Sequence, residues 1–151
     1  PEGLGDPAGD YFTRLYPIEA LKGMLEECDF IVLAVPLTPE TKNLFNAETF
    51  AAMKPGSFLV NVSRGGVVDE TALEQALRSG KLGGAVLDVF TQEPLPQDNP
   101  LWNVPNLMIT PHVSGISAHY MDDVVDLFIT NLKAYLADEP LRNVVDPSKG
   151  Y

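Results

Sequence analysis

The chain contains 151 residues, of which 45% are hydrophobic, and it carries a formal net charge of −11. The hydrophobic content suffices for a core of ordinary single-domain size, whereas the acidic balance predicts no nucleic-acid or anionic-membrane partner, because both attract clustered Lys and Arg. No apolar run approaches the roughly 18 residues that span a bilayer, and the single cysteine, Cys28, has no partner for an internal disulfide, which indicates a reducing, cytoplasmic setting.

Helical and strand-like segments alternate along the chain. Residues 1–10 are rich in Gly, Pro and Asp and lack a regular period, which is typical of a loop within a longer chain. Helical spacing and capping residues predict helices at 17–27, 47–53, 69–80 and 117–136. Apolar runs predict strands at 30–35, 57–62, 84–89 and 106–110. Because the first run is continuous, we expect that strand to be buried on both faces.

This alternation predicts an α/β fold with a parallel, doubly wound sheet. Open sheets of this kind bind ligands at the carboxyl ends of their strands. Four polar side chains stand at or just beyond the ends of three predicted strands, namely Arg64, Asp88, Glu93 and His112. We therefore expect them to gather at one edge, where a guanidinium, a carboxylate and an imidazole can hold an anion and move a proton.

Each of these residues also has a plainer interpretation. Arg64 suits a carboxylate beside a carbonyl, with Gly65 letting the backbone approach a ligand, or it is a surface arginine paired with an Asp. Glu93 alone resembles a solvated loop glutamate, but beside His112 it would orient the imidazole and favour the protonated ring. Asp88 ends an apolar run, so its carboxylate must face the crevice or find a partner.

Other chemistries are less well supported. Two histidines and one cysteine lack the spacing of a zinc site, so we predict no metal site. Ser63 and Ser114 lie outside any Gly-x-Ser-x-Gly sequence and have no nucleophile context. His119 falls inside the predicted long helix as a packed or solvated residue, and we expect Trp102 to be a core anchor.

Four motifs, in order, carry a resemblance to a known family: VPLTPET at 35–41, NVSRG at 61–65, LDVFTQEPL at 87–95 and TPH at 110–112. Together they resemble the D-isomer-specific 2-hydroxyacid dehydrogenases. The ending, LRNVVD before the final Gly-Tyr, looks closest to the glyoxylate/hydroxypyruvate reductase-like branch. The resemblance implies that residues 1–113 are the C-terminal part of a Rossmann-like cofactor domain. Residues 114–151 would then be a long helix and tail that return to the substrate domain.

The chain departs from this family pattern because it contains no Gly-x-Gly-x-x-Gly sequence. The phosphate-binding loop, and the residue that separates NAD from NADP, would lie upstream of Pro1. The resemblance thus implies strands three to six of the cofactor domain. In the strand order 3-2-1-4-5-6, the strand at 30–35 would have no neighbour within the chain, and we expect the isolated chain to be inactive.

The resemblance implies interconversion of a small 2-keto acid and a D-2-hydroxy acid with NAD or NADP. Arg64 would bind the substrate carboxylate, His112 would act as the acid and base, and Glu93 would support His112. The resemblance also implies a homodimer. Residues placed by the resemblance around the cofactor are Val35, Pro36, Thr41, Val62, Ser63, Arg64, Asp88, His112, Ser114 and Gly115.

Two alternative functions use the same residues. The Arg, Glu and His trio would equally serve a dehydrogenase of another small anion, such as phosphite. A non-catalytic NAD(H)-sensing regulatory module would keep the fold for partner binding. Turnover of glyoxylate or hydroxypyruvate would favour the enzyme, whereas cofactor binding without turnover would favour the sensor.

Overall fold

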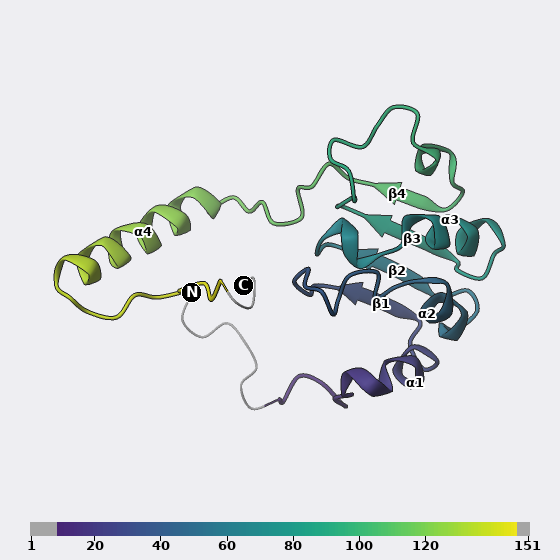
Figure 1. Cartoon of the computed structure of the whole chain (residues 1–151), viewed down its shortest axis with the longest axis horizontal. Coiled ribbons are helices and arrows are strands. Elements are labelled where there is room, and N and C mark those ends of the chain that lie inside the picture. The colour runs from purple at the N-terminus through teal and green to yellow at the C-terminus, as the bar shows by residue number, and fades with distance from the viewer. Residues whose placement is uncertain (1–8, 148–151) are drawn as a thin grey trace.

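The computed structural model describes residues 9–147 and contains a four-stranded parallel sheet (Figure 1). The strands are shorter than predicted, and they lie in the order of the sequence. Their bounds are β1 (Phe30–Leu33), β2 (Phe58–Asn61), β3 (Gly84–Leu87) and β4 (Leu107–Ile109). Each strand therefore places its carboxyl end at the same edge of the sheet, and the α/β, Rossmann-like fold class is confirmed.

Strand β1 has a neighbour within the chain, contrary to our expectation. It pairs in parallel with β2, with Phe30 opposite Phe58 and Leu33 opposite Asn61. A third strand in the order 3-2-1-4-5-6 would not lie beside the next strand along the chain. The continuous order β1-β2-β3-β4 instead steps across the sheet in one direction, as successive strands do on either side of the point where such a sheet reverses its order.

Some of the helices begin at a residue whose side chain caps the helix. The helices are η1 (Ile18–Ala20), α1 (Leu21–Leu25), α2 (Ala47–Ala52), η2 (Gly65–Val67), α3 (Glu70–Arg78), η3 (Pro100–Asn103) and α4 (Tyr120–Leu136). Asn46 and Thr49 form a capping box at the start of α2, and Asp69 accepts a hydrogen bond from the Ala72 amide at the start of α3. Helix α4 begins after His119, three residues later than predicted, so His119 precedes the helix.

The hydrophobic core lies on one face of the sheet. Alternate side chains of β1, β2 and β3 pack there against side chains of α1, α2 and α3. The strands contribute Ile31, Leu33, Leu59 and Leu87, and the helices contribute Leu25, Phe50, Leu73 and Leu77. Right-handed crossovers that step across a sheet in one direction place their helices on the same face.

The opposite face of the sheet is largely uncovered within residues 9–147. On this face Phe30 is 70% exposed and Val32 is 61% exposed, so the prediction that the first strand is buried on both faces is wrong. A continuous apolar run indicates that both faces can be covered, but the direction of the crossovers decides which face the chain's own helices reach.

Helix α4 stands apart from the sheet, joined to it by an extended segment (Figure 1). Its apolar side chains, including Phe128 and Leu132, are exposed in the described part of the chain. The Asn131 side chain holds the following tail by hydrogen bonds to the backbone of Arg142. That residues 114–151 return to a substrate domain remains a prediction, and residues 1–8 and 148–151 lie outside the described chain. Among the described residues, no helix has the length and apolarity needed to cross a membrane.

Candidate active site

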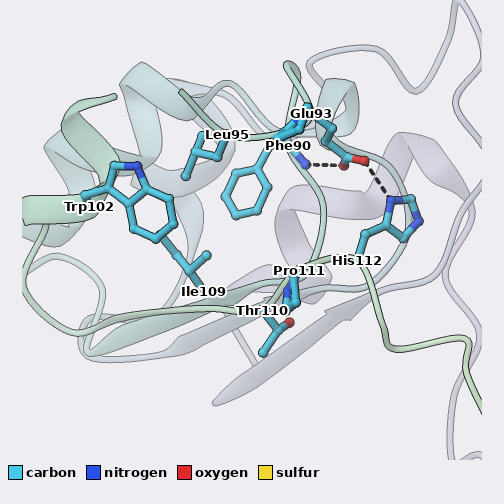
Figure 2. A pocket seen from close by; sticks show the side chains of 9 residues that line it. Phe90, Glu93, Leu95, Trp102, Ile109, Thr110, Pro111 and His112 are labelled. Carbon is cyan, nitrogen blue, oxygen red and sulfur yellow. Dashed lines mark hydrogen bonds and ion pairs between the residues drawn. The ribbon is translucent and has the colours of Figure 1, made fainter. Parts of the chain in front are cut away.

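Glu93 and His112 form a direct pair beyond the ends of β3 and β4. The His112 Nδ1 atom lies 2.7 Å from Glu93 Oε2, and both side chains are partly exposed to solvent (Figure 2). The other carboxylate oxygen, Oε1, accepts a hydrogen bond from the Phe90 amide at 2.8 Å. The hydrogen bonds from His112 and Phe90, followed by the nearby charges of His112 and Arg64, lower the pKa of Glu93. The predicted contact between this carboxylate and the imidazole is confirmed.

Asp88 fixes the turn that presents His112. Its carboxylate is 1% exposed and accepts hydrogen bonds from the Thr110 hydroxyl and from the backbone amides of Val113 (2.9 Å) and Ser114 (2.8 Å). Burial alone would raise the pKa of Asp88, but the hydrogen bonds from Ser114, Thr110 and Val113 hold it well below its usual range. The buried carboxylate therefore finds its partners in the 110–114 turn.

The same turn holds His112 in an unusual backbone conformation. His112 has φ of 56°, in the left-handed region that residues other than glycine rarely adopt. Asp88 binds Thr110 on one side of this residue and Val113 and Ser114 on the other. The turn is thus fixed on both sides of His112, and the imidazole is directed toward Glu93.

Asn61 performs the corresponding task for the turn that carries Arg64. It is fully buried; its Oδ1 accepts hydrogen bonds from the Ser63 amide (3.0 Å) and hydroxyl (2.7 Å), and its Nδ2 donates to the Arg64 carbonyl (3.1 Å). The Arg64 side chain is exposed and donates to the Ser63 carbonyl at 2.7 Å. Asn61 was not among the residues predicted for the site. Its position as a polar residue at the end of an apolar strand was the feature of the sequence that could have indicated it.

Gly65 brings the Arg64 turn and the Glu93 loop together. A Cβ atom at Gly65 would lie 1.9 Å from the carbonyl carbon of Phe90, so only glycine allows this backbone contact. The sequence led us to expect close approach of a ligand at Gly65, but the space beside it is filled by the Phe90 backbone. The turn of Arg64 therefore lies directly against the loop that carries Glu93.

The remaining residues predicted around a cofactor lie along the same edge. Val35 and Pro36 are exposed just after β1, whereas the Thr41 hydroxyl donates to the Pro36 carbonyl (2.7 Å) and accepts from the Thr38 amide (2.8 Å). After β2, Val62 is half-buried and Ser63 is buried; after β4, Ser114 and Gly115 are exposed, with open space beside Gly115.

This edge fits one part of a dinucleotide. Exposed apolar side chains after β1 and open backbone near Gly115 suit a flat, largely apolar ring group. Residues 9–147 contain no Gly-x-Gly-x-x-Gly loop that could hold the phosphates. In the same range, no group of three or more His, Cys, Asp or Glu side chains is placed to hold a metal ion.

A cavity of about 640 Å³ lies beside the Glu93–His112 pair (Figure 2). It is lined by Phe90, Glu93, Pro94, Leu95, Trp102, Ile109, Thr110, Pro111 and His112. Trp102 is 50% exposed at this cavity, and its indole N–H donates to the Pro96 carbonyl at 2.7 Å. The prediction that Trp102 is a core anchor is therefore wrong, because η3 carries Leu101 inward and leaves the indole at the surface.

Comparisons with known proteins identify a family of similar sequences. The family model described as "D-isomer specific 2-hydroxyacid dehydrogenase, NAD binding domain" matches residues 8–114. The chain is 45% identical over 128 residues to a glycerate dehydrogenase of Methylorubrum extorquens, covering 83% of this chain and 40% of the relative. It is 43% identical over 127 residues to glyoxylate/hydroxypyruvate reductase B of Pectobacterium carotovorum, covering 84% of this chain and 40% of that relative.

A solved structure shares the fold of this chain. The D-isomer specific 2-hydroxyacid dehydrogenase from Xanthobacter autotrophicus Py2, in complex with NADPH and MES, superimposes with a TM-score of 0.81 at 45% sequence identity. The match covers 88% of this chain and 54% of that one. The chain spans about 40% of the length of the curated relatives that it matches.

Proposed function

The chain belongs to the D-isomer-specific 2-hydroxyacid dehydrogenase family, and from this premise we propose that it carries the acid–base centre of an NAD(P)-dependent oxidoreductase. The proposed reaction interconverts a small 2-keto acid and a D-2-hydroxy acid, with glyoxylate and hydroxypyruvate as the leading substrates. The observation that carries the proposal is the 2.7 Å contact between His112 Nδ1 and Glu93 Oε2. Relatives named glycerate dehydrogenase and glyoxylate/hydroxypyruvate reductase support the substrate class.

His112 is the proposed proton donor and acceptor. Because the Nδ1–H group donates a hydrogen bond to the ionised Glu93 carboxylate, that proton stays on the ring, and Nε2 is the atom that exchanges a proton with substrate. In reduction, Nε2 of the protonated ring gives its proton to the substrate carbonyl oxygen; in oxidation, neutral Nε2 takes the hydroxyl proton. Glu93 orients the ring and stabilises its positive charge, as a carboxylate does for the histidine of an acyl-transfer triad.

Arg64 is the proposed binding residue for the substrate carboxylate. Its guanidinium is exposed at the same edge as Glu93, close enough for its charge to contribute to the lowered pKa of that carboxyl. The planar fork of N–H donors matches a carboxylate, and the positive charge also stabilises an oxygen that gains electron density during reduction.

A bound nicotinamide cofactor would supply the hydride in reduction and accept it in oxidation. Val35, Pro36 and Thr41 would line its adenosine side. Val62, Ser63, Asp88, Ser114 and Gly115 would flank the remainder, together with Arg64 and His112. Both NAD and NADP are compatible with these residues. We extend the proposal to a homodimer in the cytoplasm, as the family resemblance and the single cysteine led us to expect.

Steady-state kinetics of the complete protein test this function. We expect glyoxylate and hydroxypyruvate to be reduced with NADH or NADPH. A His112→Asn variant, which suits the left-handed backbone, should lose most of the rate in both directions while still binding cofactor in a fluorescence titration. Cofactor binding without turnover by the parent protein would favour a sensing module instead. Turnover of phosphite but not of 2-keto acids would move the proposal to another small anion.

A further inference from the structure

Glu70 reaches from helix α3 to the loop that carries Glu93. It is the first residue of α3, and its Oε1 accepts a hydrogen bond from the Thr91 backbone amide at 2.6 Å. The two residues are 21 positions apart in sequence. A carboxylate that accepts from a backbone N–H makes a charge-assisted hydrogen bond, which is stronger than one between neutral groups.

The start of the Glu93 loop is consequently held by two carboxylates and one close backbone contact. The Phe90 amide donates to Glu93 Oε1, and the next amide, of Thr91, donates to Glu70 Oε1. The Phe90 backbone also lies against Gly65, where no side chain would fit. The Phe90–Thr91 peptide is thus fixed between helix α3 and the Arg64 turn.

This arrangement gives each candidate catalytic residue its own bracing side chain. Asn61 braces the turn of Arg64, and Asp88 braces the turn of His112. Within its own loop, Glu93 binds only a backbone group, the Phe90 amide. The bracing side chain comes from outside that loop, where Glu70 binds the Thr91 amide.

We propose that Glu70 is a positioning residue that holds the Phe90–Glu93 loop so that Glu93 stays in contact with His112. The inference rests on the proposed function, because it assigns Glu70 to the same acid–base centre. The charged groups that act on Glu93 are His112 from the end of β4 and Arg64 from the turn after β2. Glu70 of α3 binds the Thr91 amide, two residues before Glu93 in the loop. Loosening the loop weakens the carboxylate's support of the protonated imidazole and leaves the cofactor-binding edge in place.

Three variants of the complete protein test this role. Glu70→Ala removes the acceptor, Glu70→Gln keeps an acceptor oxygen without the charge, and Glu74→Ala removes a carboxylate one turn further along the same helix. Glu74 pairs with Arg78 rather than with the loop, so it controls for a general effect on α3. Far-UV circular dichroism and Tm establish that each variant is folded. If Glu70→Ala does not fold, the nearly isosteric Glu70→Gln still allows the loop and the activity to be measured.

In Glu70→Ala we expect amide hydrogen exchange in residues 90–93 to quicken by about tenfold or more. We expect kcat for reduction to fall by roughly tenfold, with cofactor Kd unchanged. The alkaline fall of the rate should also move to lower pH. Glu70→Gln should restore most of the exchange protection and most of kcat, and Glu74→Ala should match the parent in all four measurements.

Unchanged amide exchange at residues 90–93 in Glu70→Ala would overturn the proposal, as would equal losses in Glu70→Ala and Glu74→Ala. A Glu70→Gln variant as impaired as Glu70→Ala would assign the effect to charge instead of to the hydrogen bond, and would also count against it. If the parent protein fails to reduce any 2-keto acid, the proposed function fails. The exchange measurement then decides separately whether Glu70 holds the loop.

Discussion

Helices α3 and α4 are both amphipathic, yet only α3 has its apolar side packed in the described chain. Leu73 and Leu77 of α3 are buried in the core, whereas Phe128 and Leu132 of α4 are exposed. An apolar stripe at helical spacing therefore predicts a helix and the side that needs a partner, without identifying the partner. The packed region also contains the proposed catalytic residues, which ties the geometry of the site to the stability of the core.

The largest expected effect contrasts the two helices directly. Leu73→Ala should lower the free energy of unfolding by about 3 kcal/mol, because it leaves a cavity in a closely packed core. Leu132→Ala should change the free energy of unfolding by less than about 0.5 kcal/mol, because leucine and alanine both favour helices and the Leu132 side chain is exposed. Urea unfolding of the 151-residue chain, followed by circular dichroism, measures both. Equal losses of unfolding free energy in the two variants would contradict the difference between α3 and α4. A larger loss for Leu132→Ala in the complete protein than in this chain would show that another part of the protein covers α4.

Within the packed region, substitution of Arg64 is expected to change the activity while the protein stays folded. Arg64→Gln should lower kcat/KM for the 2-keto acid by roughly a hundredfold, about 3 kcal/mol, because it removes a charged contact that strengthens in the transition state. Arg64→Lys should keep part of the activity, since the charge remains but the planar fork is lost. Arg78→Gln, on the surface of α3, is the matched control. A normal kcat/KM in a folded Arg64→Gln protein would show that Arg64 does not bind the substrate carboxylate.

Asp88 lies at the junction of the two regions, because it binds the residues through which the chain leaves β4 for α4. Its pKa is lowered on folding, so its contribution to stability is present above the unfolded value of about 4 and is lost as the pH falls below it. We expect Asp88→Asn to cost about 2 kcal/mol at pH 7. That difference from the parent should shrink toward pH 3. A difference that stays constant across this range would show that the ionised carboxylate is not what holds the turn.

The smallest expected effect concerns the Glu93–His112 contact. Reduction requires the protonated imidazole, and the Glu93 carboxylate favours that form. Glu93→Gln should therefore shift the alkaline fall of the reduction rate to lower pH, a modest change because water screens partly exposed charges. The oxidation rate, which needs the neutral ring, should gain at lower pH. Profiles of kcat/KM against pH in both directions provide the measurement, and two unmoved profiles would refute the support of His112 by Glu93.

Much of the fold followed from local patterns. The apolar runs around Phe30, Phe58 and Gly84 predicted parallel strands, and polar residues just beyond them predicted the edge where Glu93 and His112 meet. These predictions succeeded because they depend on short periods and on the common direction of parallel strands. The uncovered face of β1 was not predictable in this way, since it depends on the sense in which the strands are connected.

The bracing contacts were the least accessible part of the site. Thr91 and Glu70 are far apart in sequence, and the Gly65 contact depends on how two loops meet after the sheet has formed. The left-handed backbone of His112 likewise follows from the hydrogen bonds that Asp88 makes on either side of it. Such contacts arise from tertiary packing, which residue types and spacing alone do not specify.

Trp102 gives the molecule a built-in optical reporter. It is the single tryptophan of the chain, and its half-exposed ring lines the cavity beside Glu93 and His112. Indole emission depends on the polarity around the ring, so the fluorescence spectrum of this chain reports chiefly on that one cavity. Entry of an apolar molecule, or displacement of the loop that carries Leu95, should change the emission without any attached dye.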